Sequence, residues 1–131
     1  MNNKRIGNQM ERRVANTLYS KGYWVHRLQD NHNGQPFDIV SIKYNKAFCI
    51  ECKHCIGKKF NFSRIEQNQR NAFYRLKKCG SDGYIALQFG NDNAFYIVNY
   101  KTINDLEAKG IKNISEEELQ NEYSCIKFNY C

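Results

Sequence analysis

Proline and glycine, which interrupt regular secondary structure, are scarce in this chain. Only one of the 131 residues is proline and eight are glycine. Long apolar runs and low-complexity tracts are also absent, so the sequence predicts no membrane span. The nine tyrosines, eight phenylalanines and one tryptophan are too many for a disordered chain. We therefore expect one globular domain covering residues 1–131.

Acidic residues are also scarce, but only in one part of the chain. Residues 1–78 contain 16 Lys or Arg and five Asp or Glu, a balance of +11, whereas residues 79–131 carry −4. A surface charged only for solubility would not separate the two signs in this way. The basic part favours a polyanionic partner. Because the chain lacks a basic amphipathic helix with a wide apolar face, nucleic acid is favoured over a membrane. A basic surface without a partner is the alternative.

The six cysteines are expected to be reduced thiols. The basic N-terminal residues are not followed by the apolar segment of a secretory signal, so we expect a cytoplasmic protein. Cys49, Cys52 and Cys55 have the spacing of a metal or iron–sulfur motif, but they fall in a predicted strand. Because side chains alternate along a strand, Cys52 should face away from the other two. The pattern favours small core residues over a thiolate metal site.

The hydrophobic periodicity predicts an α/β protein. Apolar residues recur every fourth position over Gly7–Ser20, which indicates a helix, and a second helix should run from a capping box at Ser63–Glu66 to about Cys79. Runs rich in Ile, Val, Phe and Tyr predict strands at residues 23–28, 37–43, 46–53, 83–89 and 94–100. Residues 29–36 and 57–62 are predicted loops. Helices at 102–109 and 115–120 and a strand at 123–130 would complete a central mixed β-sheet flanked by helices.

Three of the five acidic residues in the basic part have unusual positions. Glu66 belongs to the capping box, and Asp30 lies in a polar loop, where Asp is common. Asp38 and Glu51, in contrast, lie inside apolar strands, and Glu11 lies beside the apolar stripe of the first helix. Carboxylates in apolar surroundings need a cation or a shifted pKa. These three residues are therefore candidates for a functional site.

The hairpin formed by the second and third strands brings two of these carboxylates together. If Tyr44 and Asn45 form a two-residue turn, Asp38 faces Glu51 directly, and if the turn lies one residue later, Asp38 faces Lys53. Both registers place Asp38, Glu51 and Lys53 on one face of the sheet. The hairpin therefore predicts a cluster of two carboxylates and one ammonium group.

Two opposed carboxylates favour a hard divalent cation with oxygen ligands, Mg²⁺ or Mn²⁺. Such an ion can bind a phosphate oxygen and lower the pKa of a bound water, while Lys53 can orient that water or stabilise charge on the phosphate. A structural cluster of Asp38, Glu51 and Lys53 is the alternative. On the second helix, Gln69 occupies a core-facing position where its amide needs partners. It could reach the carboxylates, the metal or DNA, or lie at the rim of the packed face.

Together these residues resemble the PD-(D/E)xK nuclease superfamily. Glu11 on a first helix, Asp38 at the start of a strand and the segment Glu51–Lys53 match its motif, with Pro36 one residue further from the Asp than usual. The resemblance implies that Asp38 and Glu51 ligate the metal together with the backbone carbonyl of Cys52. It also implies that Lys53 positions the attacking water and that Glu11 is an auxiliary ligand or water holder.

Within the superfamily the chain looks most like the Holliday-junction resolvases, over residues 7–100. The archaeal resolvases share the compact order of elements, and the bacterial RecU resolvases share a supporting glutamine on the next helix, here Gln69, eleven residues before Gly80. RecU proteins carry a long stalk insertion before the catalytic Asp, whereas this chain has only the loop Gln29–Pro36. RecU proteins also have a threonine two residues before the Asp, whereas this chain has Pro36. The resemblance implies a restriction-endonuclease-like core with a C-terminal extension at 101–131. It also implies a bacterial or phage-encoded homodimer that hydrolyses branched or duplex DNA.

Two other functions remain open at this point. One is a related nuclease with a restriction-type or nicking activity, and the other is a non-catalytic DNA-binding module whose carboxylates form an ion-pair cluster. The candidate DNA contacts are basic or aromatic residues that lie on the two predicted helices or in the predicted loops. They are Arg12, Arg13, His32, Lys58, Lys59, Phe60, Arg64 and Arg70. The alternatives are a solvated face for the charged residues and a core anchor for Phe60.

Overall fold

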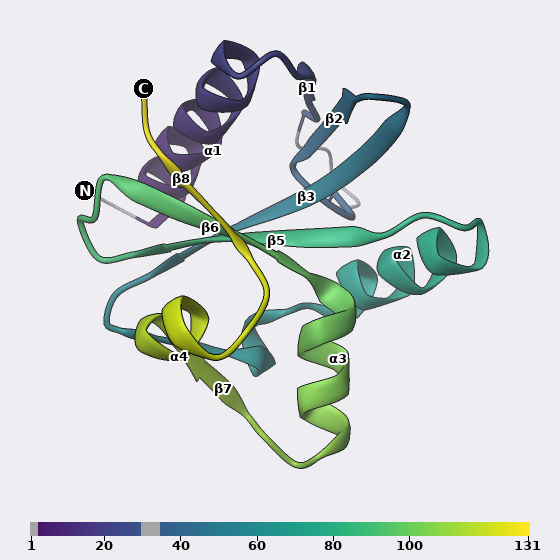
Figure 1. Ribbon diagram of the computed structural model, residues 1–131, viewed down its shortest axis with the longest axis vertical. Coiled ribbons are helices and arrows are strands. Elements are labelled where there is room, and N and C mark those ends of the chain that lie inside the picture. Colours follow the sequence, from purple (N-terminus) through teal and green to yellow (C-terminus); the bar gives the residue numbers. More distant parts are fainter. Residues whose placement is uncertain (1–2, 30–34) are drawn as a thin grey trace.

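The computed structural model describes residues 3–29 and 35–131, and this part of the chain forms helices and strands that alternate along the sequence (Figure 1). The α-helices are α1 (Asn3–Ser20), α2 (Gln67–Lys78), α3 (Tyr100–Ala108) and α4 (Glu116–Asn121), and a short 3₁₀-helix covers Phe62–Arg64. The strands are β1 (Trp24–Arg27), β2 (Ile39–Lys43), β3 (Lys46–Cys55), β4 (Lys59–Asn61), β5 (Gly83–Phe89), β6 (Ala94–Asn99), β7 (Asn113–Ser115) and β8 (Ile126–Asn129).

Six of the strands form one mixed sheet in the order β1-β2-β3-β5-β6-β8. The pair β3 and β5 is parallel, and the other neighbouring pairs are antiparallel. The ten-residue strand β3 therefore lies inside the sheet between β2 and β5. Strands β4 and β7 pair separately. The architecture confirms the predicted α/β class with a central mixed sheet flanked by helices.

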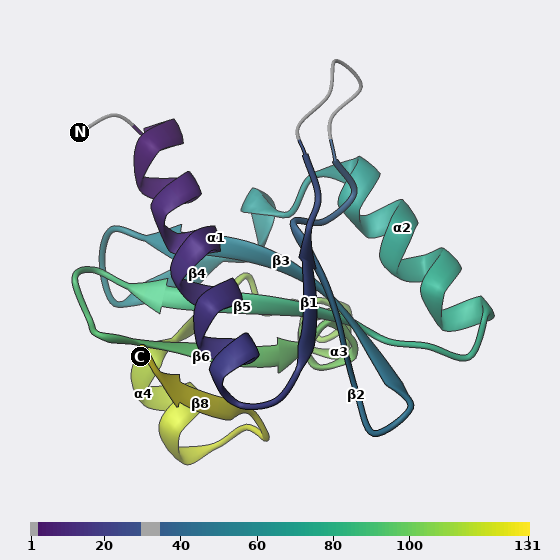
Figure 2. The ribbon, with the colours of Figure 1, turned by 90° about the horizontal axis from the view of Figure 1, so that it is seen from above.

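Each face of the sheet buries its own core. Helix α1 packs on one face, where Val14 contacts a cluster that includes Ala86 of β5. Helices α2, α3 and α4 cover the opposite face, where Phe73 and Ile85 belong to a second cluster (Figures 1 and 2). A Cβ atom at Gly83 would lie 2.1 Å from the Phe73 ring, so α2 packs this closely on β5 only because residue 83 is glycine.

The β2–β3 hairpin has the first of the two predicted registers. Lys43 pairs with Lys46 and Ile39 pairs with Ile50, so the turn is Tyr44-Asn45. Both turn residues have positive φ angles, 53° and 63°, as a type I′ turn requires. This register confirms that the N-terminal end of β2 lies beside the middle of β3, where Glu51 is found.

The start of α2 differs from the prediction. Ser63 lies inside the 3₁₀-helix, and the capping box is formed three residues later by Glu66 and Gln69. The predicted loop at 57–62 also contains a strand, β4. Both differences have one cause, because Phe60 and Phe62 are buried and hold this segment against the core.

Residues 101–131 belong to the same fold. Strand β8 pairs with β6 at the edge of the main sheet, and β7 pairs with β4. Ser115 and Glu118 form a capping box at the start of α4. None of the helices in residues 3–29 and 35–131 is both long enough and apolar enough to span a bilayer.

Candidate active site

Three carboxylates from three elements meet at one end of the β2–β3 hairpin. Glu11 comes from α1, Glu51 from β3, and Asp38 directly precedes β2. Asp38 is fixed by its own backbone and by its side chain: its amide N donates to the Ile50 carbonyl at 2.9 Å, and its Oδ2 accepts from the Cys52 amide N at 2.8 Å. The structure therefore brings together the three acids that the sequence singled out.

The electrostatics show that these acids share one crowded site. Burial, followed by the adjacent Asp38 side chain, raises the pKa of Glu51 from its usual 4.5 to about 10, and Lys53 opposes the rise. Burial and then the charge of Asp38 raise the pKa of Glu11 to about 7, while Arg27 opposes this rise. Burial is the largest cause of both shifts and the neighbouring Asp38 adds to them, so the site disfavours three ionised carboxylates at once.

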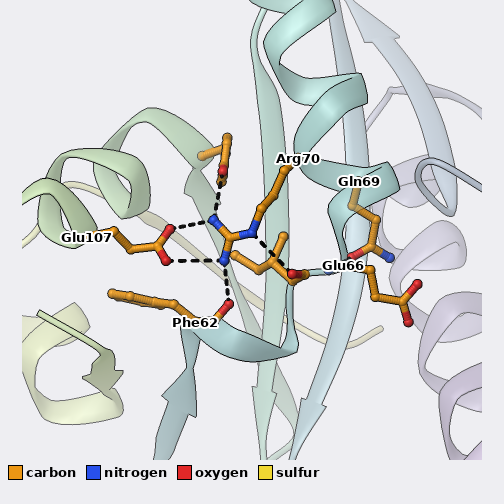
Figure 3. A network of polar contacts seen from close by, with 7 residues as sticks. Phe62, Glu66, Gln69, Arg70 and Glu107 are labelled. Atoms are coloured by element: carbon orange, nitrogen blue, oxygen red, sulfur yellow. Dashed lines mark hydrogen bonds and ion pairs between the residues drawn. The ribbon is translucent and has the colours of Figure 1, made fainter.

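Gln69 connects this cluster to the start of α2. Its Oε1 accepts from the Glu66 amide N at 3.0 Å as part of the capping box, and its Nε2 donates a hydrogen bond to Oε2 of Glu51. Figure 3 shows Gln69 on the first turn of α2, above Glu66. One amide side chain thus caps the helix and orients a buried carboxylate, which gives the core-facing glutamine its polar partners.

Arg27 is a site residue that sequence reasoning missed. Its Nη2 lies 3.2 Å from Oε2 of Glu11, and its buried Nε has no hydrogen-bond partner among the described residues. The one signal in the sequence is a basic residue on the predicted strand that precedes Asp38. Arg27 supplies positive charge at the Glu11 side of the cluster, and Lys53 supplies it at the Glu51 side.

The donor set fits a hard divalent cation. Among residues 3–29 and 35–131 no group of three or more His, Cys, Asp or Glu side chains is arranged to hold a metal. The set implied by the motif is different, because it combines the Asp38 and Glu51 carboxylates with the backbone carbonyl of Cys52. All of these donors are oxygens, which Mg²⁺ and Mn²⁺ prefer. A bound cation would also stabilise the ionised forms of Glu11 and Glu51, whose pKa values burial and Asp38 raise.

The three clustered cysteines lie on different sides of β3. Cys52 packs against the core under α1, whereas Cys55 belongs to the core on the opposite face. The structure confirms that Cys52 and Cys55 face opposite sides of the sheet, as alternation along the strand predicts. Burial raises the pKa of the Cys55 thiol to about 11, which favours the protonated thiol at neutral pH.

A groove of about 560 Å³ runs beside Lys53. It is bordered by Ile6 and Gly7 of α1, by β3 and the turn that follows it, and by Lys59, Asn61 and Arg64. Two of the predicted DNA-binding residues, Lys59 and Arg64, therefore share a wall with Lys53. Arg64 is exposed and donates to the His54 carbonyl at 2.7 Å, which fixes its position.

The other predicted DNA contacts on described elements have mixed surroundings. Arg12 is exposed on α1. Arg13 donates to Asn93 and stacks over the Tyr130 ring at 3.8 Å. Lys58 is exposed but lies 3.2 Å from Glu116. His32 lies outside the described residues.

Two predicted DNA contacts are corrected by the structure. Phe60 is completely buried in the core, so its ring is not free to stack on a base. The Arg70 side chain is partly exposed, but its guanidinium is engaged within the chain, where it pairs with Glu107 at 2.6 Å and donates to the Phe62 carbonyl at 2.8 Å (Figure 3). Both residues are structural, and the alternating basic and aromatic pattern that suggested DNA contact reflects anchoring of this segment to the core.

Fold and site together define the class of the molecule. A mixed sheet whose hairpin carries an Asp and a Glu-x-Lys, with a Glu on the preceding helix, has the restriction-endonuclease-like core of the PD-(D/E)xK nucleases. The structure is similar to that of Hjc, a Holliday junction resolvase from Archaeoglobus fulgidus, with a TM-score of 0.60 and 21% sequence identity over 83% of this chain and 86% of that chain. That similarity supports the fold.

The family follows from the sequence itself. A family model described as Recombination protein U, RecU, matches residues 31–131. The chain belongs to the RecU family, as the resemblance carried by Asp38, Glu51, Lys53 and Gln69 implied. No curated protein sequence matches the chain.

Proposed function

We propose that this protein is a Holliday-junction resolvase, a structure-specific DNA endonuclease that cuts phosphodiester bonds in four-way junctions during recombination with the help of Mg²⁺, which Mn²⁺ can replace. Membership of the RecU family supports the reaction class. The observation that carries the assignment of the site is the meeting of Glu11, Asp38 and Glu51, two of them with raised pKa values, beside Lys53.

The residues of the chain have distinct tasks in this reaction. Asp38, Glu51 and the Cys52 carbonyl would hold the ion, which would polarise the phosphate and lower the pKa of a bound water. Lys53 would orient the water whose oxygen attacks phosphorus; the water loses a proton, the bond from phosphorus to the leaving oxygen breaks, and the leaving oxygen gains a proton. Gln69 keeps the Glu51 carboxylate in place through its hydrogen bond. Glu11 holds the water or serves as an auxiliary ligand.

The active form is proposed to be a homodimer in the cytoplasm of a bacterium or of a bacterium infected by a phage. A four-way junction has two equivalent strands to cut, so two copies of the site related by a twofold axis match its symmetry. The groove beside Lys53, with its two further cations Lys59 and Arg64, would bind the phosphates that lead to each cut.

The experiment compares cleavage of a synthetic four-way junction and of a duplex with the same arm sequences, in Mg²⁺. The wild-type protein should cut the junction in two symmetric strands and leave the duplex uncut. Asp38→Asn should lower the cleavage rate about a hundredfold or more while junction binding is retained. The matched control is Asp105→Asn, because Asp105 is an exposed acid on α3.

A second measurement tests the metal without relying on activity. Titration calorimetry with Mn²⁺ should show binding to the wild type and to Asp105→Asn but not to Asp38→Asn. Cleavage of duplex and junction at equal rates would replace the resolvase by another nuclease of the superfamily. Junction binding without either cleavage or Mn²⁺ binding would leave only a DNA-binding module.

A further inference from the structure

The turn after β3 presents an isolated apolar side chain. Ile56 is 91% exposed, the highest value among the large hydrophobic residues that the structure describes. It directly follows Cys55, which is 1% exposed, and lies three residues after Lys53. Single exposed apolar residues are common on protein surfaces, so the exposure of Ile56 gains meaning only from the groups around it.

The exposure of Ile56 does not come from a loosely held segment. On one side of the turn, the Cys55 carbonyl accepts from the Gly90 amide N at 2.7 Å, and His54 Nε2 lies 2.9 Å from the Gly90 carbonyl O. On the other side, the Lys58 carbonyl accepts from the Glu116 amide N at 2.9 Å. The backbone is therefore fixed by hydrogen bonds before and after Ile56, and the exposed side chain projects from an ordered turn.

The surroundings of Ile56 suit a polyanion. Ile56 borders the groove of about 560 Å³ that also contains Lys53, Lys59 and Arg64. Among the described residues that line this groove, none is acidic. A DNA backbone lying in the groove would have its phosphates beside these three cations and its bases beside an apolar side chain.

We propose that Ile56 is a wedge that inserts between neighbouring bases of bound DNA near the cut. The inference rests on the proposed function. Proteins that kink DNA insert Ile, Leu, Met or Phe between base steps, and unstacking a step costs a few kcal/mol. At the branch point of a junction the stack is already interrupted, so insertion is easier there than in continuous duplex. Ile56 thus favours binding of branched DNA over continuous duplex, a distinction that the metal site alone does not make.

The position of the wedge relative to the cut follows from the strand. Residues in a strand rise about 3.3 Å each, so the end of β3 at Cys55 lies about 7 Å beyond Lys53, and Ile56 is the first residue of the turn that follows. Stacked bases rise about 3.4 Å per step. The side chain should therefore act within about three nucleotides of the phosphate that Lys53 faces.

The first test uses fluorescence of 2-aminopurine placed within three nucleotides of the cut in a four-way junction. In the cleavage-deficient Asp38→Asn protein, binding should raise the fluorescence by about threefold because the base is unstacked. Adding Ile56→Ala should remove the rise at saturating protein, while Ile56→Leu should keep it. The matched control is Ile126→Ala, because Ile126 is also an exposed isoleucine, 52% exposed, but lies on the edge strand β8.

The second test uses cleavage rates of otherwise wild-type protein. Ile56→Ala should lower the rate on a fully paired junction by about tenfold, and should leave the rate unchanged on a junction with unpaired bases at the branch point, where no stack has to be opened. An undiminished fluorescence rise in the Ile56→Ala protein, or equal rate losses on both junctions, would overturn the wedge. If the wild type does not cut junctions at all, the proposed function fails instead.

Discussion

Glu51 is the residue at which folding and function conflict most clearly. The residue is 4% exposed, and burial together with Asp38 raises the pKa of its carboxyl to about 10. In the absence of a cation the folded protein therefore holds a proton there that the unfolded chain, with a pKa near 4.5, releases at neutral pH. A site that binds a cation tightly must keep such carboxylates close together. Without the cation, this arrangement lowers the stability of the folded protein.

This conflict predicts a pH dependence of stability in metal-free buffer. Because the pKa of Glu51 is raised in the folded state from 4.5 to about 10, its proton is bound on folding between these pH values. The free energy of unfolding should fall as pH rises, by about 1 kcal/mol per pH unit for one such group. Urea denaturation from pH 5 to 9 in the presence of a chelator measures the slope. Glu51→Gln should reduce the slope, and most strongly above pH 7, because Glu11 with its pKa of about 7 contributes only at lower pH.

The control for this prediction is Glu117→Gln, since Glu117 is exposed on α4. This variant should keep the slope of the wild type. Equal slopes in the wild type and in the Glu51→Gln protein would mean that another group governs the pH dependence. Mn²⁺ should raise stability most at high pH, where the ion replaces the proton.

At the residue scale, the sequence predicts most of the carboxylate cluster. Alternation along the strands and a two-residue turn place Asp38, Glu51 and Lys53 on one face, and the structure has this register. Arg27 could not be found in the same way, because its contact with Glu11 depends on the angle at which α1 crosses the sheet. No local pattern encodes that angle.

At the element scale, the start of α2 shows how tertiary contacts choose between local signals. Ser63–Glu66 and Glu66–Gln69 both have the spacing of a capping box. Burial of Phe62 draws Ser63 into a 3₁₀-helix, so the helix starts at the second box. The strand pairing of β4 with β7 is equally hidden, because it joins segments about fifty residues apart that are too short to show periodicity.

Arg70 holds α2 to α3, and this role predicts a stability change. Its guanidinium donates to both carboxylate oxygens of Glu107, to the Tyr100 hydroxyl, and to the carbonyls of Phe62 and Ile65. A lysine has one ammonium group and cannot reach this set, so Arg70→Lys should lower the free energy of unfolding by about 2 kcal/mol. Urea denaturation provides the measurement.

Arg75→Lys is the matched control, because Arg75 is exposed on the same helix. It should change stability by less than about 0.5 kcal/mol. Equal losses in the two variants would remove the structural role of Arg70. Junction affinity should change little in the Arg70→Lys protein, which separates this arginine from the DNA contacts among which the sequence had placed it.

For the whole molecule, the separation of charge along the chain is partly reversed by folding. Acids from residues 79–131 form ion pairs with cations from residues 1–78: Glu107 pairs with Arg70, and Glu116 pairs with Lys58. The cations that line the groove beside Lys53 are thus only some of those in residues 1–78. Sequence counting predicts a polyanionic partner, but only the fold shows which cations are available to it.

This selection can be tested by the salt dependence of junction binding. Each phosphate that a lysine neutralises releases a counterion, so Lys59→Gln should reduce the slope of log affinity against log salt by about one. This slope can be measured by fluorescence anisotropy of a labelled junction at salt concentrations from about 50 to about 200 mM NaCl. The control Lys109→Gln removes the same charge from the exposed end of α3 and should leave the slope unchanged. Equal changes in both variants would show that binding follows net charge alone, and that the groove beside Lys53 is not where the phosphates lie.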